Sequence, residues 1–214
     1  MSRCVLAIET STTRASLAVV KDGAVVFESA FVSKRSHNSQ LFGPLSAALE
    51  AVGRELDLVV VGLGPGSYTG VRIAISAAHG VALSRGVPLV GWSSLLAGDG
   101  VGESDYRVVG DARRGRLYVV EVKDGELVEA PELISVEEAR ERLLAGSAPW
   151  LTFDEKLPLP DVDVGSIRPV RPAAVRLAMK GAAATAEQVE HLSARLVEPL
   201  YLEGAFITVA KKKG

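Results

Sequence analysis

Two Lys-Asp-Gly tripeptides, at residues 21–23 and 123–125, each end an aliphatic run. An Asp-Gly pair after such a run predicts a tight β-hairpin, because glycine adopts the positive φ that the favoured two-residue turn requires. The register around both tripeptides is the same, since residues 106–131 align with residues 4–31 at a constant offset of 102 residues. This alignment pairs Glu9 with Asp111, Arg14 with Arg116 and Val20 with Val122.

Two explanations of this match are open. Any two Asp-Gly hairpins resemble one another, so the match can arise by chance. The other explanation is an internal duplication. It is favoured because an acidic residue ends the first strand in both halves, at Glu9 and Asp111, and a hairpin does not require one.

The first half has the residue pattern of a mixed α/β unit. Runs of β-branched residues predict strands, and apolar residues at helical spacing predict helices. The predicted elements, in chain order, are strands at residues 4–8, 15–20 and 24–31, a helix at about 39–52, a strand at 56–61, a helix at about 69–85 and a strand at 88–92.

The second half repeats this plan and then departs from it. Residues 97–105 carry three glycines and few apolar residues, so we divide the chain into a lobe at 1–100 and a smaller lobe at 101–214. A capping box at residues 135–138 predicts a helix that ends at Gly146, and a further helix runs from Pro172 to about Lys180. The plan is typical of duplicated lobes of the actin-like ATPase (ASKHA/RNase H-like) type, with mixed sheets and a truncated second lobe.

Composition excludes some classes of function. With 24 Lys+Arg and 26 Asp+Glu, the net charge of −2 gives no global basic field for nucleic acid. The one cysteine, Cys4, cannot form an internal disulfide, which fits a cytoplasmic protein. We expect no membrane insertion, because no run of 18 apolar residues occurs and the start lacks a signal-peptide core.

The segment GLGPGSYTG, residues 62–70, lies between a predicted strand and a predicted helix. It lacks the lysine of a Walker loop, the third glycine of a dinucleotide fingerprint and the flanking glycines of a nucleophile elbow. Two readings remain: the amides at the helix start hold an anion, or the glycines serve only a tight turn. We favour the turn, in which Gly64 and Gly66 adopt backbone angles that other residues avoid and Pro65 rigidifies the bend.

The helix after this turn carries two rows of small residues at helical spacing. One row is Ile73, Ala77, Gly80 and Ser84, and its neighbour is Ala74, Ala78 and Ala82. Small side chains allow another helix to approach closely. We expect one row to pack on the sheet and the other to meet a helix of this chain or of a second protein.

Four motifs resemble the bacterial TsaB (YeaZ) family, in the same order and over nearly the whole chain. They are LAIETST, GLGPGSYTGVRIAISAAHGVALSRGVPLVGWSSL, DARRGRLY and PLYL. The resemblance implies a cytoplasmic, catalytically silent paralogue of TsaD. It also implies pairing with TsaD to make threonylcarbamoyladenosine in tRNA, at N6 of the adenosine beside the anticodon, with an ATPase, TsaE, assisting turnover.

The residues agree with catalytic silence. TsaD-like proteins carry a His-x-x-x-His metal pair where this chain has Ser94 and Gly98, and His37, His79 and His191 are scattered. The actin-like phosphate loop, Asp-x-Gly-x-Thr, is replaced by residues 9–13, which lack the glycine and begin with Glu9. We therefore expect no catalytic, cofactor-binding or metal-binding residues.

We expect the two helices of the first lobe to form the surface shared with TsaD, as a four-helix bundle, and to self-associate as a homodimer when the chain is alone. The expected contacts are Leu41, Leu45, Leu49, Ile73, Ala77 and Gly80, with Arg72 and His79 as polar ones. The alternative is an enzyme, either a small actin-fold kinase or transferase or a metallopeptidase. A tRNA contact through residues 113–116 or the lysines at 211–213 would be auxiliary at most.

Overall fold

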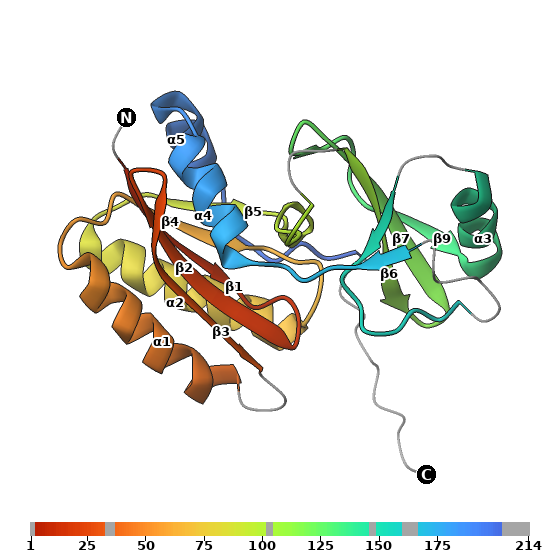
Figure 1. The fold of residues 1–214 in the computed structure, drawn as a ribbon, viewed down its shortest axis with the longest axis horizontal. Helices are drawn as coiled ribbons and strands as arrows, with labels where there is room; N and C mark the ends of the chain where they lie inside the picture. The colour runs from red at the N-terminus through yellow and green to blue at the C-terminus, as the bar shows by residue number, and fades with distance from the viewer. Residues whose placement is uncertain (1–2, 33–36, 102–104, 146–148, 160–166, 203–214) are drawn as a thin grey trace, which may run out of the picture.

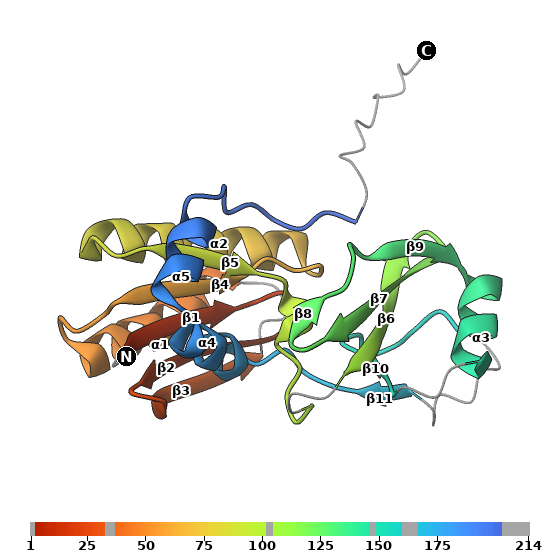
Figure 2. The ribbon, with the colours of Figure 1, turned by 90° about the horizontal axis from the view of Figure 1, so that it is seen from above.

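The computed structural model describes residues 3–32, 37–101, 105–145, 149–159 and 167–202. They form two lobes that lie side by side, each built around a mixed β-sheet (Figures 1 and 2). The predicted α/β fold class, with a mixed sheet in each half, is confirmed. Among the described residues, no helix is long and apolar enough to cross a membrane.

The strand–strand–strand–helix plan holds in the first half, whereas the second half has four strands before its helix. In chain order the elements are β1 (Cys4–Glu9), β2 (Arg14–Lys21), β3 (Ala24–Val32), α1 (His37–Val52), β4 (Leu58–Gly62), α2 (Tyr68–Arg85), β5 (Leu89–Trp92), the 3-10 helix η1 (Ser94–Leu96), β6 (Tyr106–Arg113), β7 (Arg116–Lys123), β8 (Glu126–Leu127), β9 (Glu132–Ser135), α3 (Val136–Ala145), β10 (Trp150–Thr152), β11 (Ile167–Pro169), α4 (Ala174–Ala183) and α5 (Ala186–Ser193).

The first sheet has the strand order β3-β2-β1-β4-β5. Strands β1, β2 and β3 form an antiparallel meander, whereas β4 runs parallel to β1, and β5 parallel to β4. The predicted hairpin between β2 and β3 turns at Asp22 and Gly23, with φ of 55° and 78°. Every residue of β1 and β4 is buried, because helices cover these central strands on both faces.

The second sheet repeats this hairpin. Its strand order is β11-β10-β6-β7-β8, and β9 also pairs with β7. Strands β6 and β7 are antiparallel, and β10 runs parallel to β6. The turn after β7 uses Asp124 and Gly125, with φ of 51° and 70°, the same left-handed conformation as in the first lobe. Strand β8 spans only two residues, and β9 takes over the pairing with β7.

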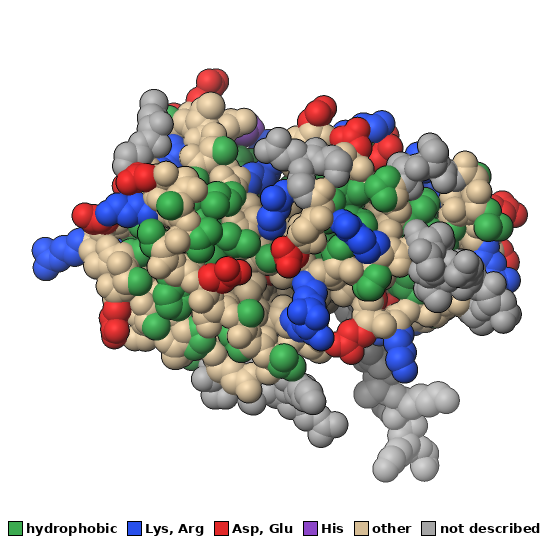
Figure 3. All heavy atoms as spheres, in the orientation of Figure 1, with side chains coloured by type: hydrophobic (Ala, Val, Ile, Leu, Met, Phe, Trp, Pro, Cys, Tyr) green, Lys and Arg blue, Asp and Glu red, His purple; other side chains and the backbone are tan. Residues whose placement is uncertain are grey.

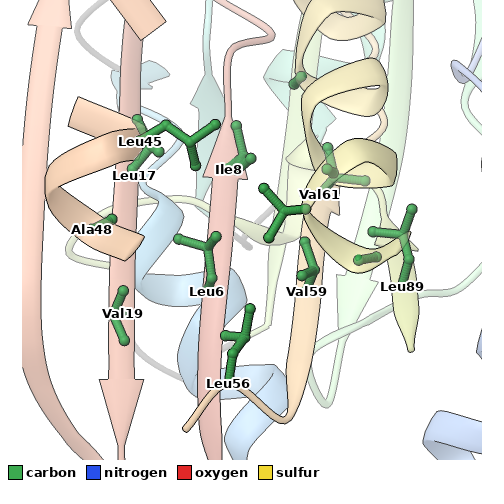
Figure 4. Packing of buried hydrophobic residues seen from close by; sticks show 14 of the residues in the cluster. Leu6, Ile8, Leu17, Val19, Leu45, Ala48, Leu56, Val59, Val61 and Leu89 are labelled. Atoms are coloured by element: carbon green, nitrogen blue, oxygen red, sulfur yellow. The ribbon is translucent and has the colours of Figure 1, made fainter. Parts of the chain in front are cut away.

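Side chains of the first sheet alternate between two hydrophobic cores. Leu6, Ile8 and Val59 point toward α1 and α2 (Figure 4). Val5 and Val60, on the opposite face, pack against α4. This alternation follows from the two-residue period of a strand. The sheet is therefore the middle layer of a three-layer lobe, with α1 and α2 on one side and α4 and α5 on the other (Figure 1).

The placement of α4 and α5 differs from what we expected. Residues 101–214 were assigned to the second lobe, yet α4 contacts β1, β2 and β4 of the first sheet, and α5 contacts β5. The amide of Ala174 donates to Ser16 Oγ at 2.9 Å, and Gly181 allows α4 to approach the side chains of Val5 and Val60. The chain thus returns to the first lobe after building the second sheet.

Two crossings of the chain between the lobes are hydrogen-bonded to each other. The amide of Asp99 donates to the carbonyl of Arg171 at 2.8 Å, and the amide of Ala173 donates to the carbonyl of Ala97 at 2.8 Å. Gly98 and Pro172 form an antiparallel bridge between these contacts. We call residues 97–99 and 171–173 the hinge pair.

The ends of the helices follow capping and stop signals within a few residues of each end. Helix α2 begins after its N-cap Ser67 and ends at Gly86, which has a φ of 66°. Helix α1 begins at His37, two residues before the predicted start, and contains Pro44. Helix α3 keeps half of the predicted capping box, because Ser135 Oγ accepts the amide of Glu138 while the Glu138 carboxylate binds Arg142. The predicted stop at Gly146 lies outside the described residues.

Three of the elements that the sequence did not predict lie near the end of the described chain. Strands β10 and β11 lie in the proline-rich stretch at 149–172, where no long periodic run marks them. Helix α5 has a readable signal that we did not use: Thr185 and Gln188 form a full capping box.

Candidate functional site

The glycine-rich turn packs tightly against the loop between β1 and β2. A Cβ atom at Gly66 would lie 2.1 Å from the carbonyl oxygen of Ser11, and one at Gly70 would lie 2.2 Å from that of Thr10. The amide of Ser67 donates to the Ser11 carbonyl at 2.6 Å, and Thr10 Oγ1 donates to the carbonyl of Gly70 at 2.7 Å. These glycines therefore serve close backbone approach.

The start of α2 has a side-chain cap. Ser67 Oγ accepts the amide of Gly70 at 3.1 Å, and the amide of Ser67 itself is taken by Ser11. An anion held by the amides of Ser67 and Gly70 would have to compete with both bonds. The geometry supports the tight-turn reading, with Gly64 at a φ of 85°.

Glu9 is sealed beneath this turn. Its side chain is fully buried, and Oε1 accepts the amide of Ser11 at 2.6 Å. Oε2 lies where a Cβ of Gly62 would be and has no hydrogen-bond partner among the described residues. Burial raises the pKa of this carboxyl, and the hydrogen bond from Ser11 opposes the shift. Glu9 points into packing rather than into an open cavity.

A cleft of about 640 Å³ lies between the two lobes. Ser11 and Thr13 line it from the first lobe, and Asp111 and Asp154 line it from the second. Asp154 Oδ2 accepts the amide of Asp111 at 2.8 Å, and burial raises the pKa of the Asp154 carboxyl. The Asp111 carboxylate binds Arg113 at 2.8 Å, so it is already paired with a cation.

A second hollow, a groove of about 700 Å³, lies between α1 and α2 on the outer side of the first lobe. Its lining is Phe42, Leu45, Tyr68, Thr69, Arg72, Ile73, Ser76, Ala77, Gly80, Val81 and Ser84. Arg72 is the one charged residue among these. The groove is therefore apolar along its length and positive at one end.

The groove shows which row of small residues faces outward. Ala74, Ala78 and Ala82 are buried against the sheet. Ile73, Ala77, Gly80 and Ser84 line the groove. A Cβ at Gly80 would meet nothing within 4 Å, so the groove is open at that point.

The expected contact residues divide into two groups. Arg72, Ile73, Ala77 and Gly80 line the groove, and His79 is exposed on α2 outside its lining. Leu41, Leu45 and Leu49 face the sheet instead, because the leucine stripe of α1 packs in the hydrophobic core between α1 and the sheet. Leu41 is 1% exposed and cannot offer a contact to another chain, whereas Leu45 also reaches the groove floor.

Phe42 in the groove and Tyr201 at its end are among the residues that the sequence analysis missed. Phe42, next to the leucine stripe, is 56% exposed and lines the groove. Tyr201 binds Arg72 from the far end of the chain, with its hydroxyl 2.8 Å from Nη2. The PLYL motif that contains Tyr201 was recognised, but nothing in the sequence places it against α2.

Comparison with known proteins adds to this geometry. The family model described as TsaD, tRNA N6-adenosine threonylcarbamoyltransferase, matches residues 24–142. The Escherichia coli tRNA threonylcarbamoyladenosine biosynthesis protein TsaB is 33% identical over 168 residues, covering 69% of this chain and 69% of that protein. The chain belongs to the TsaB family.

Two further similar proteins bear on the length and the fold of the chain. An uncharacterized protein of Mycobacterium tuberculosis is 41% identical over 126 residues, covering 56% of this chain and 60% of that protein. The match thus spans less than two thirds of the length of this mycobacterial relative. The solved structure of YeaZ from Pseudomonas aeruginosa has a TM-score of 0.65 at 24% identity and covers 94% of this chain and 100% of its own. That likeness shows a common fold.

The two positions that hold a histidine pair in TsaD-like proteins have structural roles in this TsaB-family chain. Ser94 is buried, and its Oγ accepts the amide of Gly64 at 2.9 Å. Gly98 belongs to the hinge pair. Of the three histidines, His191 contacts Arg195, and the side chain of His37 lies outside the described residues.

Proposed function

We propose that this TsaB-family chain is a non-catalytic scaffold subunit. In this proposal it pairs with a TsaD-type subunit that transfers the threonylcarbamoyl group to N6 of the adenosine beside the tRNA anticodon. The observation that carries the proposal is the groove between α1 and α2, an apolar surface with small residues on its floor. Its family relatives in Escherichia coli and Bacillus subtilis are tRNA threonylcarbamoyladenosine biosynthesis proteins.

The packing around the β1–β2 loop supports the absence of catalysis. A phosphate loop needs open amides and a carboxylate that can reach a metal-bound water. In this chain the amide of Ser11, in that loop, donates to the Glu9 carboxyl, and this carboxyl is buried beneath Gly62. Substrate phosphates would have to displace protein contacts to occupy the same place.

The groove supports a helical partner. Ala77 and Gly80 let a second helix approach the α2 backbone, and Phe42 and Tyr68 provide exposed aromatic surface at the rim. Aromatic residues and arginine are the residue types that dominate binding energy at protein interfaces. When the chain is alone, the same surface would pair with a second copy of the chain. The one charged residue of the groove, Arg72, lies at its end, so the apolar centres of two copies can meet.

The test is a pair of matched arginine substitutions on one helix. Gly80→Arg places a charged side chain in the groove without a clash, since a Cβ there meets nothing within 4 Å. Leu83→Arg is the control, because Leu83 is 87% exposed on α2 and does not line the groove. We expect Gly80→Arg to abolish co-purification with a TsaD-type subunit and Leu83→Arg to leave it unchanged. Equal binding by both variants would exclude the groove as the partner surface.

The rival function is an enzyme that uses the cleft between the lobes. Its support is the pair of carboxylates, Asp111 and Asp154, that face this cleft. The two functions differ in what the purified chain binds alone. Calorimetry with Mg-ATP distinguishes them: we expect no binding below millimolar concentration, and micromolar affinity would favour the enzyme.

The scaffold proposal also includes a cytoplasmic location, a TsaE-type ATPase in the larger assembly and an auxiliary tRNA contact at most. On the face in Figure 3, Lys and Arg side chains lie interspersed with Asp and Glu over both lobes. Arg113, in the hairpin between β6 and β7, is paired with Asp111. Reconstituted tRNA modification with and without this chain tests its role in the assembly.

A further inference from the structure

The segment at residues 197–202, which we call the strap, contacts both lobes. Val197 packs against the core between the first sheet and α2, and the amide of Leu200 donates to the carbonyl of Leu63 at 2.8 Å. Leu202 packs against the core of the second lobe, beside Tyr106 and Val108. Figure 2 shows the chain after α5 running past α2 toward the second lobe.

The strap and the hinge pair are separate connections between the lobes. Residues 199–202 line the cleft, whereas the residues of the hinge pair do not. If the lobes rotate apart about the hinge pair, the strap has to leave Leu63 or the second-lobe core. The strap is therefore a second connection between the lobes, beside the cleft.

The strap is fastened to α2 by one arginine that contacts two tyrosines. The Arg72 guanidinium lies 4.1 Å from the centre of the Tyr68 ring and 6.0 Å from that of Tyr201. Its Nη2 and Nε donate to the Tyr201 hydroxyl at 2.8 and 3.1 Å. Both rings are half exposed, Tyr68 at 59% and Tyr201 at 49%. We call these three residues the arginine stack.

The arginine stack stands where the groove meets the cleft. Tyr68 and Arg72 line the end of the groove, and Tyr68 and Tyr201 line the cleft. A protein that fills the groove would cover the exposed side of this stack. Cation–π contacts and hydrogen bonds strengthen when water is removed from around them.

We propose that the strap is part of the partner surface: a TsaD-type subunit seated in the groove packs on Tyr201, buries the arginine stack and thereby holds the two lobes together. The inference rests on the proposed function and adds to it a contact residue outside the helix pair. It also gives the C-terminal PLYL segment a role, because Leu200, Tyr201 and Leu202 fasten it to the first lobe, to α2 and to the second lobe in turn.

The first test measures affinity for the TsaD-type subunit. Tyr201→Ala removes ring and hydroxyl from a half-exposed position, so the fold is retained, and we expect about tenfold weaker binding. Tyr201→Phe keeps the ring and loses only the bond to Arg72, and we expect about threefold weaker binding. Leu196→Ala is the matched control, because Leu196 is 79% exposed and lies before the strap.

The second test measures hydrogen exchange of the Leu200 amide, which reports whether the strap is attached to Leu63. We expect the partner to slow this exchange in the native chain by about tenfold or more, and to slow it much less in Tyr201→Ala. Exchange at Leu200 that the partner does not change would overturn the proposal.

The outcomes of these tests distinguish failure of the strap proposal from failure of the scaffold function. If Gly80→Arg abolishes binding while Tyr201→Ala binds as tightly as the native chain, the strap is not part of the surface and the scaffold function stands. If Gly80→Arg binds normally, the groove is not the partner surface and the strap proposal fails with it, whereas the scaffold function fails only if the native chain does not bind a TsaD-type subunit.

Discussion

The amide of Ser67 donates a hydrogen bond of 2.6 Å to the carbonyl of Ser11. This bond joins the N-cap of α2 to the loop between β1 and β2. It can form because Gly66, the residue before Ser67, has no side chain to hold the two backbone segments apart. The start of the helix that carries the groove is thus positioned by the loop between β1 and β2.

Gly66→Ala should therefore destabilise the protein strongly. The new Cβ would lie 2.1 Å from the Ser11 carbonyl oxygen at a residue with a φ of 155°, so the turn and the loop must separate. We expect a loss of about 3 kcal/mol in the free energy of unfolding, measured by urea denaturation. Gly80→Ala is the control: it meets open space in the middle of α2, and we expect a gain of up to about 1 kcal/mol. Similar effects of the two substitutions would argue against close packing at Gly66.

Glu9→Gln should remove a pH dependence of stability. Burial raises the pKa of the Glu9 carboxyl in the folded state above its value in the unfolded chain. The unfolded chain therefore releases its proton first as the pH rises. Below the unfolded-state pKa, the Glu9 carboxyl is protonated in both states and its burial costs no stability. As the pH rises from there through the folded-state pKa, the native protein loses stability.

Glutamine has nearly the same shape and does not titrate. At neutral pH we expect Glu9→Gln to be more stable than the native chain by on the order of 1 kcal/mol, with the difference disappearing near pH 4. Chemical denaturation from pH 4 to 8 measures this difference. A constant difference over that range would show that Glu9 does not titrate with folding.

The two Asp-Gly hairpins should respond alike to the same substitution. Gly23 and Gly125 have φ values of 78° and 70°, and a Cβ at either meets nothing within 4 Å. The cost of alanine there comes from the left-handed backbone alone, and we expect about 1 kcal/mol at each site. Thermal or urea unfolding of Gly23→Ala and Gly125→Ala checks this. A loss at only one site would show that the two turns are not equivalent.

Leu177→Ala tests the position of α4. Leu177 is fully buried against the first sheet, in the core that contains Val5 and Val60. We expect a loss of about 3 kcal/mol in the free energy of unfolding. Leu144→Ala, on the exposed side of α3, should change it by less than about 0.5 kcal/mol, because Leu144 is 86% exposed. A small effect at Leu177 would contradict the packing of α4 on the first lobe.

Signals that act over a few residues were read correctly from the sequence. The Asp-Gly turns, the cap at Gly86 and the glycine-rich turn each depend on backbone angles within one short segment. Membership of the TsaB family was equally readable, because the central motif is long and specific.

What could not be read depends on contacts between distant segments. The spacing of Leu41, Leu45 and Leu49 is the same whether the stripe packs on a sheet or on a partner. Periodicity therefore could not reveal that these leucines are part of the hydrophobic core. The burial of Glu9 follows from the approach of Gly62, far along the chain. The pairing of Tyr201 with Arg72 joins residues 129 positions apart.

The return of α4 and α5 to the first sheet has a consequence for how the chain acquires its shape during synthesis. Strands β1 and β4 emerge early from the ribosome, but the helix that covers Val5 and Val60 ends at Ala183. One face of the first sheet therefore stays uncovered while the whole second sheet is translated. The nascent first lobe can close only after the second has been made, so its exposed aliphatic face is where a ribosome-associated chaperone would be needed.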